Sequence, residues 1–317
     1  MADQFFGTKF EWWFGVVEDV NDPLLAGRVR VRVYDYHTQD KVKLPTADLP
    51  WAQVILPATS ASTSDVGSSG TGLLTGSYVV GMWIDNIHQT PMVLGSINGI
   101  PLDKPNKELG FNDPLGQIPR RTEEPDVNRL ARNDKQYLHP VIQKKEEGRT
   151  ANIPVANIDQ PWNEPVYAYA PQYPKNQVFE SESGHIFETD DTPLHERIHE
   201  YHKSGTFYEI DSEGNKVTRI VGNDYQVIAG SNYVNVKGNV NLTIDNDCRT
   251  YIKGNWNIQV DGNVVENIKG TLTQTVDGEV SETYKKSQAT NIGVTLDVNA
   301  GTNIDLDAPR IDFNKER

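Results

Sequence analysis

The chain contains little cysteine and lacks the features that mark several common protein classes. Its 317 residues include one cysteine, Cys248, which excludes an intrachain disulfide and is expected to be a small buried apolar residue. The net charge is −14 and no run of five Lys or Arg occurs, so we expect no nucleic-acid partner. No stretch approaches 18 apolar residues, and the first fifteen residues lack a basic segment followed by an apolar one. We therefore expect neither a membrane-spanning helix nor an export signal.

The N-terminal hundred residues carry the pattern of short β-strands. Apolar residues alternate with polar ones, as at Val29, Val31 and Val33, and turn residues such as Asn21, Asp22, Pro23 and Gly27 separate the segments. Five such segments in so short a span predict a small Greek-key barrel. The segments are WFGVVEDV, RVRVRVYDY, WAQVILP, SYVVGMWID and PMVLGSI.

The composition changes over residues 101–178, which hold eleven of the eighteen prolines and few apolar runs. Asp126 could cap a short helix through Leu130. The stretch QPWNEPVYAYAPQYP is typical of extended, partly polyproline chain whose aromatic residues pack onto a neighbour. We interpret this region as a connector. The strand pattern resumes at residue 179.

Glycine recurs every eighth residue in the C-terminal third, and Asn246 fills the single missing position. A period this short indicates one strand and one corner per repeat, and such a unit can bury its apolar side only against other units. We expect the glycines to lie at corners where a side chain would clash or where φ must be positive. They are Gly214, Gly222, Gly230, Gly238, Gly254, Gly262, Gly270 and Gly278.

Two further residues of each eight-residue repeat follow the same period. From Ile220 onward, the residue two before each glycine position is apolar and is expected to point inward. These residues include Ile220, Ile228, Val236, Ile244, Ile252, Val260, Ile268 and Val276. The residue between alternates in charge, which would place opposite charges side by side on stacked strands and fix their register. These residues are Lys237, Asp245, Lys253, Asp261, Lys269, Asp277 and Lys285.

The repeat length favours three intertwined chains. A triangular turn needs about three strand-corner units, so a single chain would form a stub roughly 15 Å tall with unpaired edges. Three chains, each supplying one side, would instead form a needle of roughly 50 Å in which every edge is paired. Gly293 and Gly301 lie one residue early, and Pro309 follows, so we expect the repeat to taper and end there.

Candidate catalytic and metal sites are weak. His195–His199 spells H-E-x-x-H, which binds zinc only on a helix, whereas here it leads into a strand pattern whose positions four apart are separated by roughly 13 Å. His185, His199 or His202 could instead meet symmetry copies on a three-fold axis and bind a transition metal. Acidic pairs such as Glu123 with Glu124 lack the rigid scaffold of a glycosidase. We predict no catalytic residue, no cofactor and no protein-bound metal.

Three segments and the repeats together resemble the central spike protein of the baseplate of contractile-tailed bacteriophages. FGVVEDVNDPLLAGRVRVRVYDYHT, LPTADLPWAQVILP and PMVLGSINGIP resemble the oligonucleotide/oligosaccharide-binding (OB) barrel of that family. QYPKNQVFESESGHIFETDDTPLHERI resembles the start of its trimeric β-helix, and the glycine repeats resemble the needle. The resemblance implies an all-β fold with an OB barrel at 1–125, an extended linker at 126–178 and an intertwined trimeric β-helix at 179–317. The repeats would run from about 214 to 292, followed by a tapering tip at 293–317.

The resemblance also implies a function. It predicts a homotrimer in the virion tail baseplate, assembled in the host cytoplasm, whose barrels bind a ring-shaped hub and whose needle pierces the outer membrane on sheath contraction. A small tip-capping repeat protein of the proline-alanine-alanine-arginine type is a further expected partner. Some relatives carry a lysozyme domain between barrel and needle, but Asp126–Pro165 is too short to hold one. Two alternatives remain: a β-helical tailspike hydrolase or depolymerase, and a spike of type VI secretion.

Overall fold

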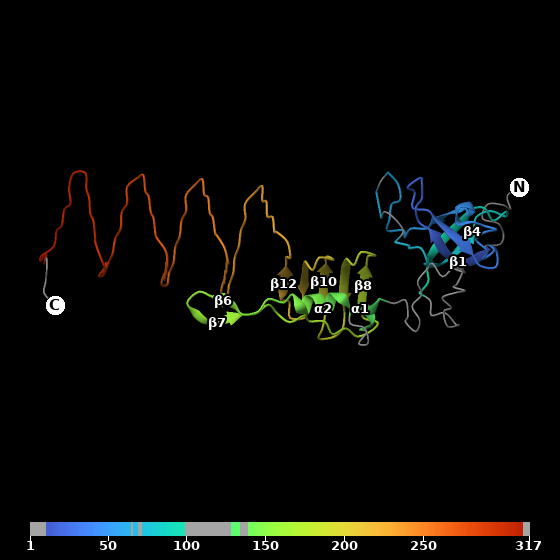
Figure 1. Ribbon diagram of the computed structural model, residues 1–317, viewed down its shortest axis with the longest axis horizontal. Helices are drawn as coiled ribbons and strands as arrows, with labels where there is room; N and C mark the ends of the chain where they lie inside the picture. Colours follow the sequence, from blue (N-terminus) through green and yellow to red (C-terminus); the bar gives the residue numbers. More distant parts are fainter. Residues whose placement is uncertain (1–10, 65, 69–71, 99–127, 134–138, 313–317) are drawn as a thin grey trace. The chain divides into compact units, whose positions relative to one another are not determined.

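The fold was determined as a computed structural model, which describes residues 11–64, 66–68, 72–98, 128–133 and 139–312. The chain divides between Asp247 and Cys248 into two units. The first holds a closed barrel of β1–β5 and a separate five-stranded sheet (Figure 1). No helix among these residues is long and apolar enough to cross a membrane.

The five strands expected near the N-terminus are confirmed and close into a barrel in the order β1-β2-β3-β5-β4. Alternate residues point inward and form a core that includes Trp13, Val31 and Val93, each less than 5% exposed. Asp22 builds the predicted turn, because its carboxylate accepts hydrogen bonds from three backbone N–H groups and Gly27 has a positive φ of 70°. The strands are β1 (Trp12–Asp19), β2 (Val29–Val33), β3 (Trp51–Val54), β4 (Tyr78–Trp83) and β5 (Pro91–Ser96).

A buried ion pair on the outside of the barrel fixes the segment after β2. The Arg32 Nε atom donates to Glu18 across 2.8 Å, and the two side chains are at most 1% exposed. Arg32 also donates to the carbonyl oxygens of Thr38 and Leu44, so it holds the segment that leads to the 3-10 helix η1 (Thr46–Asp48) against the strands.

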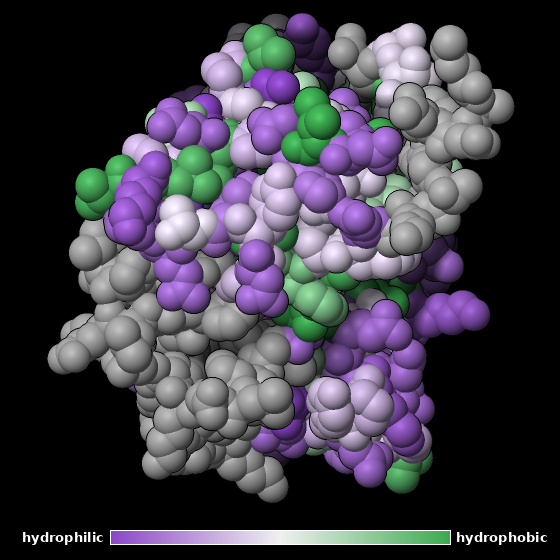
Figure 2. Space-filling model, turned by 90° about the vertical axis from the view of Figure 1, so that its right-hand side faces the viewer, coloured by the Kyte–Doolittle hydropathy of each residue, from purple (hydrophilic) through white to green (hydrophobic). Residues whose placement is uncertain are grey.

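On the surface seen in Figure 2, apolar side chains form small separate groups among hydrophilic ones.

The second sheet is an antiparallel meander in the order β12-β11-β10-β9-β8. Its strands alternate buried and exposed residues, and the buried side forms a second apolar cluster with the connector. Leu130 and Ile186 are fully buried in this cluster. The strands are β8 (Asn176–Glu180), β9 (Ile186–Asp190), β10 (Arg197–Tyr201), β11 (Phe207–Ile210) and β12 (Lys216–Arg219).

The connector contains more regular structure than the extended chain that its prolines predict. Helix α1 (Arg129–Arg132) is capped by Asn128, and Asp126 lies outside the described residues. Helix α2 (Pro140–Glu147) begins with proline at its first position, where the missing N–H group costs nothing. A hairpin of β6 (Ile153–Val155) and β7 (Ile158–Trp162) follows. The predicted aromatic anchoring holds for Tyr169, whose hydroxyl donates to the Leu130 carbonyl oxygen.

The repeats form a regular series of bends (Figure 1). A bend recurs every eight residues from 221–222 to 301–302, so the predicted period continues through Gly293 and Gly301. Positive φ occurs at Gly214 but at none of the later glycines of the repeat, so that part of the expectation is wrong. From Ile220 to Asp312 the structure has no paired strand, and the trimeric β-helix therefore stays a prediction.

Candidate assembly interface and buried ionic cluster

The side chains of the predicted inward row are less exposed in the single chain than other apolar side chains of the repeats. Its members Val236, Ile244, Ile252, Val260, Ile268 and Val276 are 45–51% exposed. Other apolar residues of the repeats keep more exposure, from 60% at Val221 to 93% at Val227. The side chains of the predicted inward row are thus partly shielded, but no described residue covers them to the degree of a core residue.

No steric contact among the described residues of the chain requires glycine at the corners from Gly222 to Gly301. A Cβ atom added at each glycine from Gly222 to Gly301 would meet no other atom within 4 Å. Neither a local clash nor a positive φ therefore explains them. Contacts among the described residues of the chain therefore give no reason for glycine at these corners.

Other apolar positions, which the glycine period alone did not identify, share the predicted inward side. In extended chain, residues two and four after each glycine position lie on the same side as the predicted row. Many of these are apolar, and simple parity within each repeat would have identified them. They include Val240, Leu242, Trp256, Ile258, Val264, Leu272 and Val280. Cys248 occupies such a position, but it is exposed in the structure, so its expected burial is not found in the single chain.

The sheet of β8–β12 presents a second apolar surface. On its uncovered face Phe179 pairs with Phe187 across the strands, with ring centroids 6.4 Å apart. Phe179, Phe187 and Ile198 are 63%, 53% and 49% exposed. Large apolar side chains are normally buried in a sheet of this size, so this face is a candidate interface.

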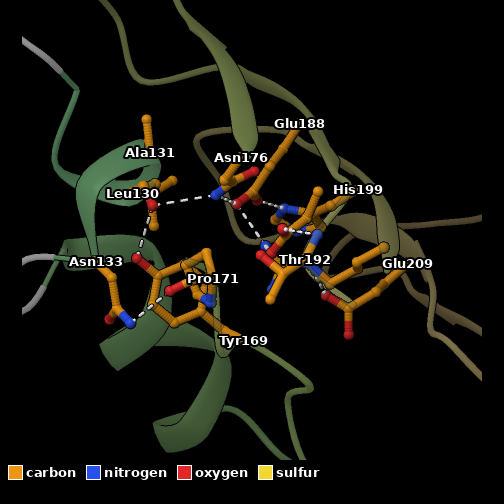
Figure 3. Close-up of polar contacts among 12 residues, drawn as sticks. Leu130, Ala131, Asn133, Tyr169, Pro171, Asn176, Glu188, Thr192, His199 and Glu209 are labelled. Carbon is orange, nitrogen blue, oxygen red and sulfur yellow. Dashed lines mark hydrogen bonds and ion pairs between the residues drawn. The ribbon is translucent and has the colours of Figure 1, made fainter. Parts of the chain in front are cut away.

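The covered face of the same sheet contains a buried cluster of charges (Figure 3). Arg197 forms an ion pair with Glu188, and neither side chain is exposed. The Lys145 Nζ atom of α2 reaches the cluster and lies 3.1 Å from the Glu209 carboxylate, and Asn176 donates to Glu188 across 2.7 Å. These five polar side chains lie on the buried side of their strands or helix: Arg197, Glu188, Lys145, Glu209 and Asn176. They tie the connector to the sheet.

His199 lies at the centre of this cluster. Its Nδ1 atom is 2.9 Å from the Glu188 carboxylate, and its Nε2 atom is 3.2 Å from Lys145 Nζ. Burial lowers the pKa of His199, and the charge of Lys145 lowers it further against the opposing effect of Glu188. Burial also lowers the pKa of Lys145 to about 8, although Glu209 opposes the shift.

The carboxylate and tyrosine of the cluster are also perturbed. Burial raises the pKa of Glu188, but the hydrogen bond from His199 and the charge of Arg197 outweigh it, so the net pKa is lowered. Burial raises the pKa of Tyr167, whose ring lies 3.7 Å from Lys145 Nζ. The sequence carried one signal of this cluster, since Glu188, Arg197, His199 and Glu209 have the same strand parity as apolar Ile186, Tyr201 and Phe207.

The two histidines of the H-E-x-x-H motif lie in different surroundings. His195 is exposed in the turn before β10, whereas His199 is buried on β10. His199 is engaged by Glu188 and Lys145, so it is not free for the axial ion site considered from the sequence. His185 and His202 lie beside each other, with ring centroids 4.5 Å apart. Among the described residues, no group of three His, Cys, Asp or Glu could hold a metal ion.

Comparison with known proteins identifies the barrel. Residues 35–200 match the family model described as the Gp5 N-terminal OB domain. The chain belongs to this family. The predicted OB barrel is thereby confirmed, and the match extends through the Gp5-family connector into the second sheet.

Two curated relatives extend the comparison of this Gp5-family chain. "Protein Gp5" of Vibrio phage KVP40 is 38% identical over 273 residues, which cover 76% of this chain and 65% of the relative. "Pre-baseplate central spike protein Gp5" of Enterobacteria phage T4 is 44% identical over 123 residues, or 37% of this chain and 21% of the relative. The chain thus matches slightly less than two thirds of the first relative and about a fifth of the second.

Proposed function

We propose that this chain is the homotrimeric central spike of a contractile phage tail baseplate. The carrying observation is the stretch from Ile220 to Asp312, which bends every eight residues and has no paired strand in the single chain. Backbone N–H and C=O groups of an ordered, apolar-lined segment need partners. Two further copies of the chain provide them with the same period and the same side-chain pattern.

Three copies also account for the half-exposed inward row. In a triangular prism, residues such as Val260 and Ile268 of the three chains meet around one axis and lose the exposure that they keep in the single chain. The glycine corners then approach the neighbouring chains, which explains why the chain itself leaves space beside them. The alternating Lys and Asp residues would lie outside and oppose a slip of one repeat.

The uncovered face of β8–β12 continues this interface. Phe179, Phe187 and Ile198 would pack against the corresponding faces of the other two copies. The connector would cover the opposite, outer face through the ionic cluster. The trimer would thus begin at the sheet and continue along the repeats.

The role of spike rests on the family and on the name of the T4 relative. That relative is called a pre-baseplate central spike protein, and this chain shares its OB domain family. By this likeness the barrels would bind the ring-shaped hub in the virion, and the needle, ending near a tip-capping repeat protein, would pierce the host outer membrane. The copies would assemble in the host cytoplasm. The role is mechanical and non-enzymatic, because continuous strand pairing transmits force without a reactive site.

The oligomeric state tests the proposal most directly. Native mass measurement of the purified chain, at two concentrations at least tenfold apart, is expected to give three times the chain mass at both. A stable monomer would overturn the trimer and with it the needle. Clearing of purified peptidoglycan or capsular polysaccharide by the protein would overturn the non-enzymatic role separately.

A further inference from the structure

Helix α2 depends on its contacts with the sheet. It has eight residues, which is too short for a stable isolated helix. Val141 packs into the apolar cluster, and Lys145 is only 3% exposed and reaches the ionic cluster. Arg219 of β12 donates to the Lys145 carbonyl oxygen across 3.0 Å. The attachment of α2 therefore rests on the packing of Val141, on the Lys145 side chain and on a hydrogen bond to the Lys145 backbone.

The geometry around His199 requires one protonation state. The Glu188 carboxylate can only accept, so the His199 Nδ1 atom must carry a hydrogen. The Lys145 ammonium can only donate, so the Nε2 atom must have a free electron pair. The neutral imidazole with its hydrogen on Nδ1 satisfies both neighbours. A protonated ring would direct an N–H group at an ammonium group 3.2 Å away.

We propose that Lys145, His199 and Glu188 form an acid-sensitive latch, which holds α2 on the sheet when His199 is neutral and releases α2 when His199 gains a proton. This inference concerns contacts within one chain and is independent of the proposed trimer.

The groups that face His199 define the balance of charge. From β9 comes Glu188, from β11 Glu209, and from α2 Lys145, while Arg197 lies on the same strand. Tyr167 of the connector covers the ring, with centroids 5.7 Å apart. The two carboxylates favour a proton on His199, whereas burial and Lys145 oppose it.

The direction of the pH effect follows from this balance. The pKa of His199 is lower in the folded chain than in the unfolded chain, where it is about 6.5. Detachment of α2 would remove Lys145 and part of the burial, which are the causes that lower the pKa of His199. The attached form therefore binds fewer protons, and the attachment weakens as the pH falls.

The strands should remain paired when the latch opens. His199 faces Glu188 across the β10–β9 ladder, and a charge on the imidazole strengthens that hydrogen bond. The same charge repels Lys145, which is held to the sheet by side-chain contacts rather than by a strand ladder. Helix α2 is therefore the part that leaves.

Hydrogen exchange of the full chain, read by mass spectrometry, tests the latch. After correction for the intrinsic pH dependence of exchange, protection of residues 139–148 is expected to fall as the pH is lowered from 7.5 to 5.5. Residues 186–190 and 197–201 should keep their protection. Unchanged protection of α2, or an equal loss in the strands, would overturn the proposal.

Variants assign the effect to His199. His199→Gln cannot titrate and should abolish the pH dependence, whereas His195→Gln, in the exposed turn of the same motif, should leave it as in the native chain. His139 caps α2 and is also a histidine, so His139→Asn keeps an acceptor while removing the imidazole. Loss of the pH dependence in His139→Asn, or its survival in His199→Gln, would contradict the latch. Should His199→Gln fail to form the sheet, Lys145→Met must reduce the pH dependence by removing the repelled ammonium group.

Discussion

Arg197 and Glu188 form an ion pair in which neither side chain has any exposed surface. They lie on neighbouring strands, β10 and β9, on the side of the sheet that the connector covers. A pair so deeply buried is costly to form but more costly to break, because removal of one partner leaves an uncompensated charge. The pair therefore links the folding of the sheet to the docking of the connector.

Replacement of Arg197 by Met tests this link. The substitution leaves Glu188 and nearby Asp190 without their cation, and we expect a loss of about 3–5 kcal/mol in the stability of the sheet. Lys203→Met, at an exposed position in the next turn, is the matched control and should change stability by less than about 0.5 kcal/mol. Thermal unfolding followed by circular dichroism at fixed protein concentration measures both. Equal shifts in the two variants would show that the buried pair is unimportant.

Gly81 provides a test of the barrel. A Cβ atom at this position would overlap Cζ2 of Trp13 and the backbone oxygen of Met92, which cannot move without distorting β5. Gly81→Ala should destabilise the barrel by about 1–3 kcal/mol. Gly95→Ala on the neighbouring strand meets no atom within 4 Å and should have little effect. Tryptophan fluorescence during denaturation reports on Trp13 and Trp83 in the core, and an identical midpoint for both variants would refute the packing argument.

The alternating charges of the repeats predict a salt-dependent effect. Lys253→Asp places three acidic residues in succession at 245, 253 and 261. If these residues are neighbours on stacked strands, each like-charged pair should cost about 0.2–1 kcal/mol, and salt near 1 M should remove most of the loss. Lys253→Gln removes the charge without adding repulsion and should show a smaller, weakly salt-dependent change. Melting temperatures of both variants at low and high salt decide the point; a salt-independent loss in Lys253→Asp would argue against stacked charges.

Local periodicity was sufficient to predict the barrel strands and the sheet strands. At β2, for example, Val29, Val31 and Val33 alternate with arginines, and all three valines are buried; Arg32 is buried as well, through its ion pair with Glu18. The bends of the repeats were likewise visible in the glycine spacing. The strands follow from apolar residues two apart and the bends from glycines eight apart, so both can be predicted without knowing which distant residues are in contact.

The connector and the ionic cluster could not be predicted in this way. Helix α2 has a weak apolar pattern, and its position depends on Lys145, whose partners His199 and Glu209 are 54 and 64 residues away in sequence. Composition alone favoured extended chain because proline is frequent, yet Pro140 lies at a helix start where it is tolerated. The only indication was that Glu188 and His199 lie two residues from buried Ile186 and Tyr201 on the same strands, and therefore on the same side of the sheet.

The inward row of the repeats gives the most direct test of assembly. Val260 and Ile268 are about half exposed in the single chain, so an aspartate at either position would be solvated there and should be tolerated by a monomer. In a trimer, the same substitution brings three carboxylates together in an apolar interior, and each costs several kcal/mol to bury without a partner. Val260→Asp combined with Ile268→Asp should therefore convert the trimer to monomer in native mass measurements. Gln259→Asp with Asn267→Asp, which adds the same charge at the adjacent outward positions, should remain trimeric. If both double variants assemble equally, the row does not face the axis; if both dissociate, net charge rather than the inward packing controls assembly.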